Sequence, residues 1–159
     1  VAALVREALS AFSPGEEALE TATALMSFRV WQSFGKTTIP AARVSALRDR
    51  LQAALLAAFP DARVNGGRAP RLPNTLNIAF PGLDALTAVM NLDLADIAVA
   101  TTSACATAKR EPPHVLTAMG LPPDLALASL RFSLGRSNTE DEVDRVAAVL
   151  ADLLPQLRA

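Results

Sequence analysis

The spacing of apolar residues changes along the chain, and this change most constrains the fold. Over residues 41–59 apolar side chains recur every three or four positions, as they do on one face of a helix. Over residues 74–80 and 129–134 they alternate with other residues, as they do on one face of a strand. Elements of these two kinds bury their apolar faces by packing on one another. The spacing therefore predicts helices packed on a small sheet.

The other segments complete the expected order of elements. Residues 101–111 are small and polar and are expected to form a loop. Further elements are predicted as helices over 1–12, 16–33, 83–92, 112–119 and 138–157, a short helix from 122, and strands over 62–64 and 97–100. The strands are short and separated by helices, so we expect an α+β fold with a small antiparallel or mixed sheet and helices on one face.

Composition excludes several classes of protein. Hydrophobic residues make up 51% of the 159 residues and the net charge is −1, which argues against disorder and against binding to nucleic acid. No apolar run is long enough to span a membrane. One cysteine and one histidine exclude an internal disulfide and a Cys/His zinc site, and a lone thiol is typical of the reducing cytoplasm. The chain begins at Val1 rather than Met, which favours a start inside a longer gene product.

Cys105 lies among small residues that leave a thiol accessible. Lys109 and Arg110 would favour its thiolate form, whereas Glu111 opposes them. A single cysteine among small residues is also a common inert filler of a core. These residues alone leave both interpretations open.

Several short motifs occur in a fixed order around this cysteine. They are Leu72-Pro73-Asn74-Thr75-Leu76-Asn77, Ser103-Ala104-Cys105, Glu111-Pro112, His114-Val115-Leu116, Met119-Gly120-Leu121, Ser129-Leu130-Arg131-Phe132-Ser133-Leu134-Gly135-Arg136 and Thr139-Glu140-Asp141-Glu142-Val143-Asp144. In order and spacing this set resembles the cysteine desulfurases, pyridoxal-phosphate-dependent enzymes of the class V aminotransferase family. The resemblance covers residues 41–159 and implies the small C-terminal domain of a fold-type I enzyme. Residues 1–40 match the family poorly and are treated as a separate N-terminal helical segment.

The resemblance implies roles for two residues. Cys105 would attack the sulfur of an L-cysteine–pyridoxal adduct and leave as a persulfide, with alanine as the other product, and a sulfur-acceptor protein would then receive the sulfur. The length of the loop resembles the branch that serves iron–sulfur cluster assembly. Arg131 would bind the α-carboxylate of the substrate through its guanidinium fork. The alternative for Arg131 is a solvent-facing side chain on an edge strand.

The chain also departs from the family. The lysine that carries the cofactor belongs to a His-Lys segment of the family's large domain, and the only lysines here, Lys36 and Lys109, are not in such a segment. We therefore expect pyridoxal phosphate only in the complete enzyme, which the resemblance implies is a cytoplasmic homodimer, and no desulfurase activity from this chain alone. Thr101-Thr102 replaces a more usual Ser-Gly and restricts the backbone before Cys105.

Three other functions stay open at the level of sequence. The chain could be a non-catalytic interaction or dimerisation module, a thiol sulfur carrier derived from this family, or a generic α+β ligand-binding domain. We interpret His114 as a surface or packing residue and Arg136 as a structural or interface charge. Asn74 and Asn77 are interpreted as hydrogen-bonding residues at the ends of a strand.

Overall fold

The computed structural model describes residues 41–101 and 111–158. The predicted helices over 1–12 and 16–33 lie outside the described residues, and so does Cys105. Within the described ranges, no helix has the length and apolar character needed to cross a membrane.

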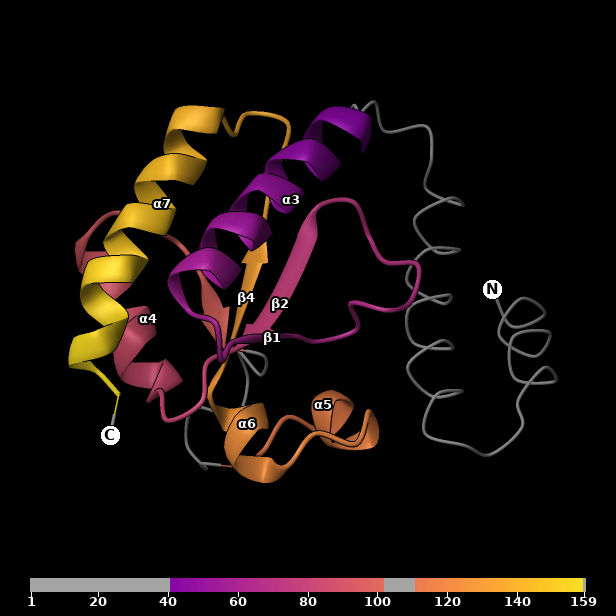
Figure 1. Ribbon diagram of the computed structural model, residues 1–159, viewed down its shortest axis with the longest axis vertical. Coiled ribbons are helices and arrows are strands. Elements are labelled where there is room, and N and C mark those ends of the chain that lie inside the picture. Colours follow the sequence, from indigo (N-terminus) through magenta and orange to yellow (C-terminus); the bar gives the residue numbers. More distant parts are fainter. Residues whose placement is uncertain (1–40, 102–110, 159) are drawn as a thin grey trace, which may run out of the picture.

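Three long helices cover one face of a small sheet. Figure 1 shows α3 (Ala41–Ala58) and α7 (Glu140–Leu153) side by side in front of the strands, with α4 (Ala85–Leu94) behind α7. All three contribute side chains to one core cluster with the sheet. Two short helices, α5 (His114–Ala118) and α6 (Pro123–Leu127), lie beyond one end of the sheet. This arrangement confirms the predicted α+β fold.

The sheet has four strands in the order β1-β2-β4-β3, and every neighbouring pair is antiparallel. Their bounds are Arg63–Val64 for β1, Thr75–Ala79 for β2, Ala100–Thr101 for β3 and Ser129–Ser133 for β4. The two inner strands alternate as predicted, so one face of each is buried under the helices. The buried side chains of the inner strands include Leu76, Ile78, Leu130 and Phe132.

The apolar stripe predicted for α3 is confirmed. Its members are all at most 5% exposed and are Val44, Leu47, Leu51, Leu55 and Phe59, the last just beyond the helix. Each such side chain contributes roughly 1.5–3 kcal/mol by its removal from water. Arg48 of the same helix is also buried, and its guanidinium donates to the carbonyl oxygen of Leu72 and to Asp49.

The end of α4 explains why β3 begins later than predicted. Asp96 has a φ of 58°, and its N–H and that of Ile97 donate to the carbonyls of Asp93 and Leu92. This pair of bonds is a Schellman motif, which closes the helix. Because the N–H of Ile97 is used there, the strand predicted over 97–100 pairs with β4 only at Ala100–Thr101.

The boundaries of α7 also differ from the prediction at one end. A capping box starts the helix: Thr139 accepts from the N–H of Glu142, and Glu142 accepts from the N–H of Thr139. The helix was predicted to run to residue 157 but ends at Leu153. Pro155 has no N–H for a helical bond, so a 3-10 turn over Leu154–Gln156 follows.

Candidate functional site

Arg131 lies on an inner strand of the sheet. On β4 it faces Asn77 of β2 on one side and Ala100 of β3 on the other. The interpretation of Arg131 as an edge-strand residue is therefore wrong. An arginine half-buried between two neighbouring strands is held more firmly than one on an exposed edge, because fewer side-chain conformations fit there.

The side chain of Arg131 points away from the helical layer. Its neighbours Leu130 and Phe132 are buried in the core, and side chains alternate between the two faces of a strand. Asn77 occupies the register position opposite Arg131, so both belong to the open face. Among the residues that the structure describes, the guanidinium of Arg131 has no hydrogen-bond or ion-pair partner. A half-buried guanidinium with no such partner is suited to bind an anion.

A chain of hydrogen bonds crosses this open face beside Arg131. The side-chain amide nitrogen of Asn65 donates to Asn77 Oδ1 over 2.7 Å and to Ser129 Oγ over 3.1 Å. The hydroxyl of Ser129 in turn donates to the carbonyl oxygen of Leu125 in α6 over 2.8 Å. Ser129 is only 1% exposed, so this end of the chain is shielded from water.

The interpretation of Asn77 as a strand-end residue is wrong. Asn77 lies in the middle of β2, and its amide is held by Asn65. Neither Asn65 nor Ser129 was predicted from the sequence as a site residue. The sequence signals for a shared polar face were the alternation of Ser129, Arg131 and Ser133 on one strand and the position of Asn77 between Leu76 and Ile78 on the other.

Cys105, the predicted sulfur acceptor, lies outside the described residues. The segment that carries Cys105 follows β3 directly, because β3 ends at Thr101. Thr101 is opposite Leu130, next to Arg131 on the neighbouring strand. The cysteine segment therefore begins beside the open face that carries Arg131.

The other candidate residues do not join this site. His114 is exposed at the start of α5, as expected of a surface residue. Arg136 is exposed, and its carbonyl oxygen accepts from Arg43 over 2.8 Å. Asn74 uses its carbonyl oxygen to accept from the N–H of Leu134, just past the paired strands. Within the described ranges, no group of three His, Cys, Asp or Glu side chains could hold a metal.

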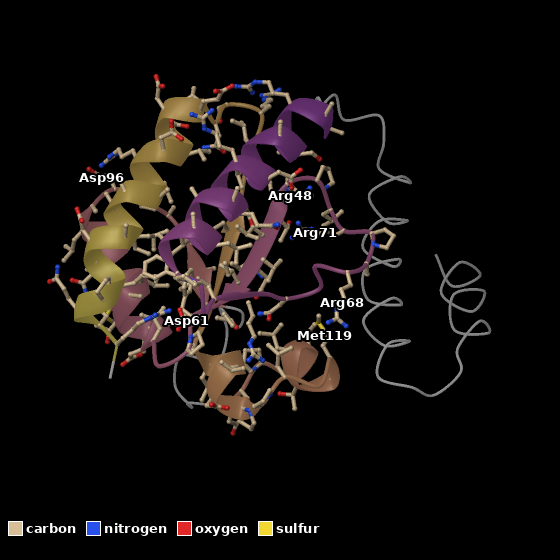
Figure 2. The ribbon with its side chains drawn as sticks, in the orientation of Figure 1. Arg48, Asp61, Arg68, Arg71, Asp96 and Met119 are labelled. Atoms are coloured by element: carbon tan, nitrogen blue, oxygen red, sulfur yellow. The ribbon has the colours of Figure 1, made fainter. Side chains whose placement is uncertain are left out.

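A second cluster of arginines lies on the opposite side of α3 from α7. Figure 2 shows Arg48 and Arg71 close together, and both approach Asp49, with Nη2–Oδ1 distances of 2.7 and 3.9 Å. Burial and the neighbouring Arg48 guanidinium lower the pKa of Arg71, although Asp49 opposes them. Arg71 also donates to Gln52 of α3. These contacts attach the segment before β2 to α3 and are structural.

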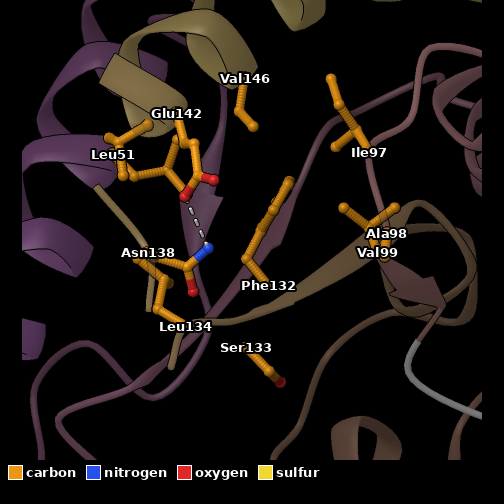
Figure 3. Close-up of a pocket in the computed structure, with 11 residues that line it drawn as sticks. Leu51, Ile97, Ala98, Val99, Phe132, Ser133, Leu134, Asn138, Glu142 and Val146 are labelled. Atoms are coloured by element: carbon orange, nitrogen blue, oxygen red, sulfur yellow. Dashed lines mark hydrogen bonds between the residues drawn. The ribbon is translucent and has the colours of Figure 1, made fainter. Parts of the chain in front are cut away.

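A small pocket lies between α7, β4 and residues 97–99 (Figure 3). Its volume is about 80 Å³, whereas pockets for small molecules usually have roughly 300 Å³ or more. The rim carries a hydrogen bond from Asn138 to Glu142, and apolar side chains such as Phe132 and Val146 line its floor. This pocket is too small to hold a cofactor.

Comparison with known proteins agrees with the resemblance found in the sequence. The sequence profile of the Aminotransferase class-V family matches residues 12–146. A cysteine desulfurase of Nostoc sp. is 45% identical over 113 residues, which is 71% of this chain and 28% of that protein. The cysteine desulfurase NifS of Azotobacter vinelandii is 44% identical over 115 residues, 72% of this chain and 29% of that protein.

Solved structures give the same result. A NifS-like protein from Rickettsia africae has a TM-score of 0.61 at 28% identity, over 70% of this chain and 28% of that chain. Another structure described as a NifS-like protein has a TM-score of 0.62 at 31% identity, over 74% of this chain and 28% of that chain. This chain thus spans less than a third of the length of the relatives it matches. By its profile match and its relatives, it belongs to the class V aminotransferase family.

Proposed function

We propose that this chain provides the substrate-carboxylate and sulfur-accepting half of a cysteine desulfurase. The observation that carries the proposal is Arg131, half-buried on the open face and without a partner among the described residues. A guanidinium presents two parallel N–H groups, which match the two oxygens of a carboxylate. The curated relatives named cysteine desulfurase support L-cysteine as the amino acid that Arg131 binds.

The proposal gives Cys105 the role of sulfur acceptor. Cys105 lies four positions after Thr101, and a fully extended chain of this length reaches at most about 14 Å. This distance limit keeps the thiol near β3, the strand that pairs with β4 beside Arg131. In the net reaction the C–S bond of L-cysteine breaks and an S–S bond forms at Cys105. The thiol hydrogen of Cys105 balances the alanine product, so no external oxidant or reductant is needed.

The persulfide on Cys105 then transfers its outer sulfur to the thiol of an acceptor protein, and iron–sulfur cluster assembly is the pathway we propose. The segment that carries Cys105 follows β3, a short strand at the edge of the sheet. The complete enzyme is proposed to be a homodimer.

Pyridoxal phosphate would stabilise the negative charge that develops on the substrate during C–S cleavage. The residues that the structure describes do not fit the task of holding it. They include no lysine, since Lys36 and Lys109 both lie outside them, and their pocket beside α7 is too small. The proposal therefore assigns the cofactor to protein outside the described residues.

The test uses the complete gene product that carries this chain, purified with its cofactor. After addition of L-cysteine, we expect alanine to form and Cys105 to gain one sulfur atom by mass spectrometry. Cys105→Ala should abolish the persulfide. His114→Ala is the matched control, because this exposed side chain on α5 should leave both products unchanged. Alanine formation with an unmodified Cys105 would overturn the sulfur-accepting role.

A further inference from the structure

We propose that Asn77 donates a hydrogen bond to the same carboxylate that Arg131 binds, and that Asn65 and Ser129 orient the Asn77 amide for this purpose. The inference rests on the proposed function for the identity of the ligand. It concerns two residues, Asn65 and Ser129, that act on the substrate only through Asn77. Asn77 is a binding residue in this scheme, and the other two are positioning residues.

The carbonyl oxygen of Leu125 can only accept a hydrogen bond, and this determines the direction of the whole chain of hydrogen bonds. The hydroxyl of Ser129, 2.8 Å away, must therefore donate its single hydrogen to this carbonyl. The oxygen of Ser129 is then left as an acceptor. The side-chain atom of Asn65 that approaches it to 3.1 Å must be a donor, which fixes that atom as Nδ2.

The same nitrogen determines the orientation of Asn77. Asn65 Nδ2 carries two hydrogens, and the second points to a side-chain atom of Asn77 at 2.7 Å. That atom must accept, so it is Oδ1 rather than Nδ2. The hydrogen bonds that link Leu125, Ser129 and Asn65 therefore determine that the oxygen of the Asn77 amide faces Asn65. The NH2 group of Asn77 is left on the other end.

The NH2 group of Asn77 and the guanidinium of Arg131 are both donors. Within the described ranges, neither has an acceptor, and the two residues face each other across β2 and β4 on the open side of the sheet. Opposed residues of antiparallel strands have Cβ atoms about 4.5–5.5 Å apart. Two such donors cannot satisfy one another, since neither supplies a lone pair. A ligand with two anionic oxygens, such as a carboxylate, satisfies both.

The sharpest test reverses the hydrogen-bond chain without touching Asn77 or Arg131. In Asn65→Asp, the side chain that faces Asn77 has only acceptors at neutral pH. The amide of Asn77 then turns, so that its NH2 group faces residue 65 and its oxygen faces the ligand. In the complete, cofactor-loaded protein, we expect KM for L-cysteine to rise about tenfold to a hundredfold, the usual effect of one hydrogen bond to a charged group. The rate at saturating substrate should change much less.

Two further variants bracket this result. Asn77→Ala removes the donor and should raise KM by a similar factor, whereas Asn65→Ala frees the amide without reversing it and should have a smaller effect. Asn91→Asp is the matched control, because it makes the same chemical change on α4, where the side chain of Asn91 bonds to the carbonyl oxygen of Thr87 and to no other described residue. Melting temperatures verify that each variant is folded.

A measurement on the unaltered protein does not depend on the folding of any variant. Binding of L-alanine, the unreactive product, should shift the side-chain N–H resonances of both Asn77 and Arg131 in nitrogen-15 NMR spectra. If Arg131→Ala raises KM but Asn65→Asp and Asn77→Ala do not, the role of Asn77 is wrong and the proposed function survives. If no variant changes KM and neither resonance shifts, the proposed function fails at this site as well.

Discussion

At the scale of single residues, we expect Arg131 to matter for activity and to contribute little to stability. Its guanidinium has no partner within the described part of the chain, so its removal breaks no side-chain hydrogen bond among those residues. We expect Arg131→Ala to change the free energy of unfolding by less than about 0.5 kcal/mol. The same variant should lower kcat/KM for L-cysteine in the complete protein by about tenfold or more, because a charge-assisted bond to the carboxylate is lost.

Arg131→Lys tests whether charge or shape matters at this position. Lysine keeps the positive charge but not the planar pair of donors, so we expect it to recover only part of the loss in kcat/KM. Urea denaturation and steady-state kinetics measure the two effects on the same samples. A large loss of stability in Arg131→Ala would indicate that the arginine has a structural partner, which contradicts the assignment.

Asp96 is the other residue whose conformation carries a prediction. Its φ of 58° closes α4, in a region of backbone conformation that glycine adopts without strain. Asp96→Gly should therefore leave the Schellman motif intact and raise the free energy of unfolding by up to about 1 kcal/mol. Asp93→Gly is the control, since glycine within α4 should lower stability by about 1 kcal/mol. A destabilised Asp96→Gly would show that the aspartate side chain contributes more than its backbone strain costs.

At the scale of elements, the start of α7 should make stability depend on pH. The N–H of Thr139 and the amide of Asn138 lower the pKa of Glu142 below its ordinary value of 4.5, and the guanidinium of Arg50 lowers the pKa of Asp144. A carboxylate with a lowered pKa in the folded state binds protons less readily than in the unfolded chain. Its contribution to stability is thus present above its ordinary pKa, which is 4.5 for Glu142 and 3.8 for Asp144, and is lost as the pH falls through the folded-state pKa.

Glu142→Gln isolates the part of this pH dependence that belongs to the capping box. The amide keeps an acceptor for the N–H of Thr139 but does not titrate. We expect the variant to lose less stability than the unaltered protein between neutral pH and pH values below 4.5, as measured by urea denaturation. Asp144 should account for part of the remaining loss. Identical pH profiles for the two proteins would contradict the lowered pKa of Glu142.

Elements with a regular apolar period were predictable from the sequence. The stripe of α3 and the alternation of β4 are local patterns, and both are confirmed. The short strand β3 was placed too early, because a hydrogen bond from Ile97 back to α4 outweighed the β propensity of its apolar residues. The bonds of Asn65 join residues 12 and 64 positions apart, and no local pattern encodes such contacts. Arg131 could therefore be proposed as a site residue from the sequence, whereas its neighbours Asn65 and Ser129 could not.

At the scale of the whole molecule, the open face of the sheet can be considered together with the fraction of its relatives that the chain spans. The three long helices cover one face and bury its apolar side chains, while the other face presents Arg131 and Asn77. The chain spans less than a third of the relatives it matches. Under the proposed function these residues bind the substrate carboxylate, and the described part of the chain includes no lysine, so the proposal assigns the cofactor-holding half of the site to protein outside the described residues.

This division of the site can be tested with the isolated chain and pyridoxal phosphate. We expect no absorbance band of a covalently bound cofactor after the two are mixed, because Lys36 and Lys109 lie outside any His-Lys segment. The complete gene product, or the chain together with the protein that provides the cofactor lysine, should show the band under the same conditions. Single variants Lys36→Ala and Lys109→Ala control for adventitious reaction at either amine. A band in the isolated chain that disappears in one of these variants would show that the chain holds its own cofactor. The proposal that other protein holds the cofactor would then be wrong.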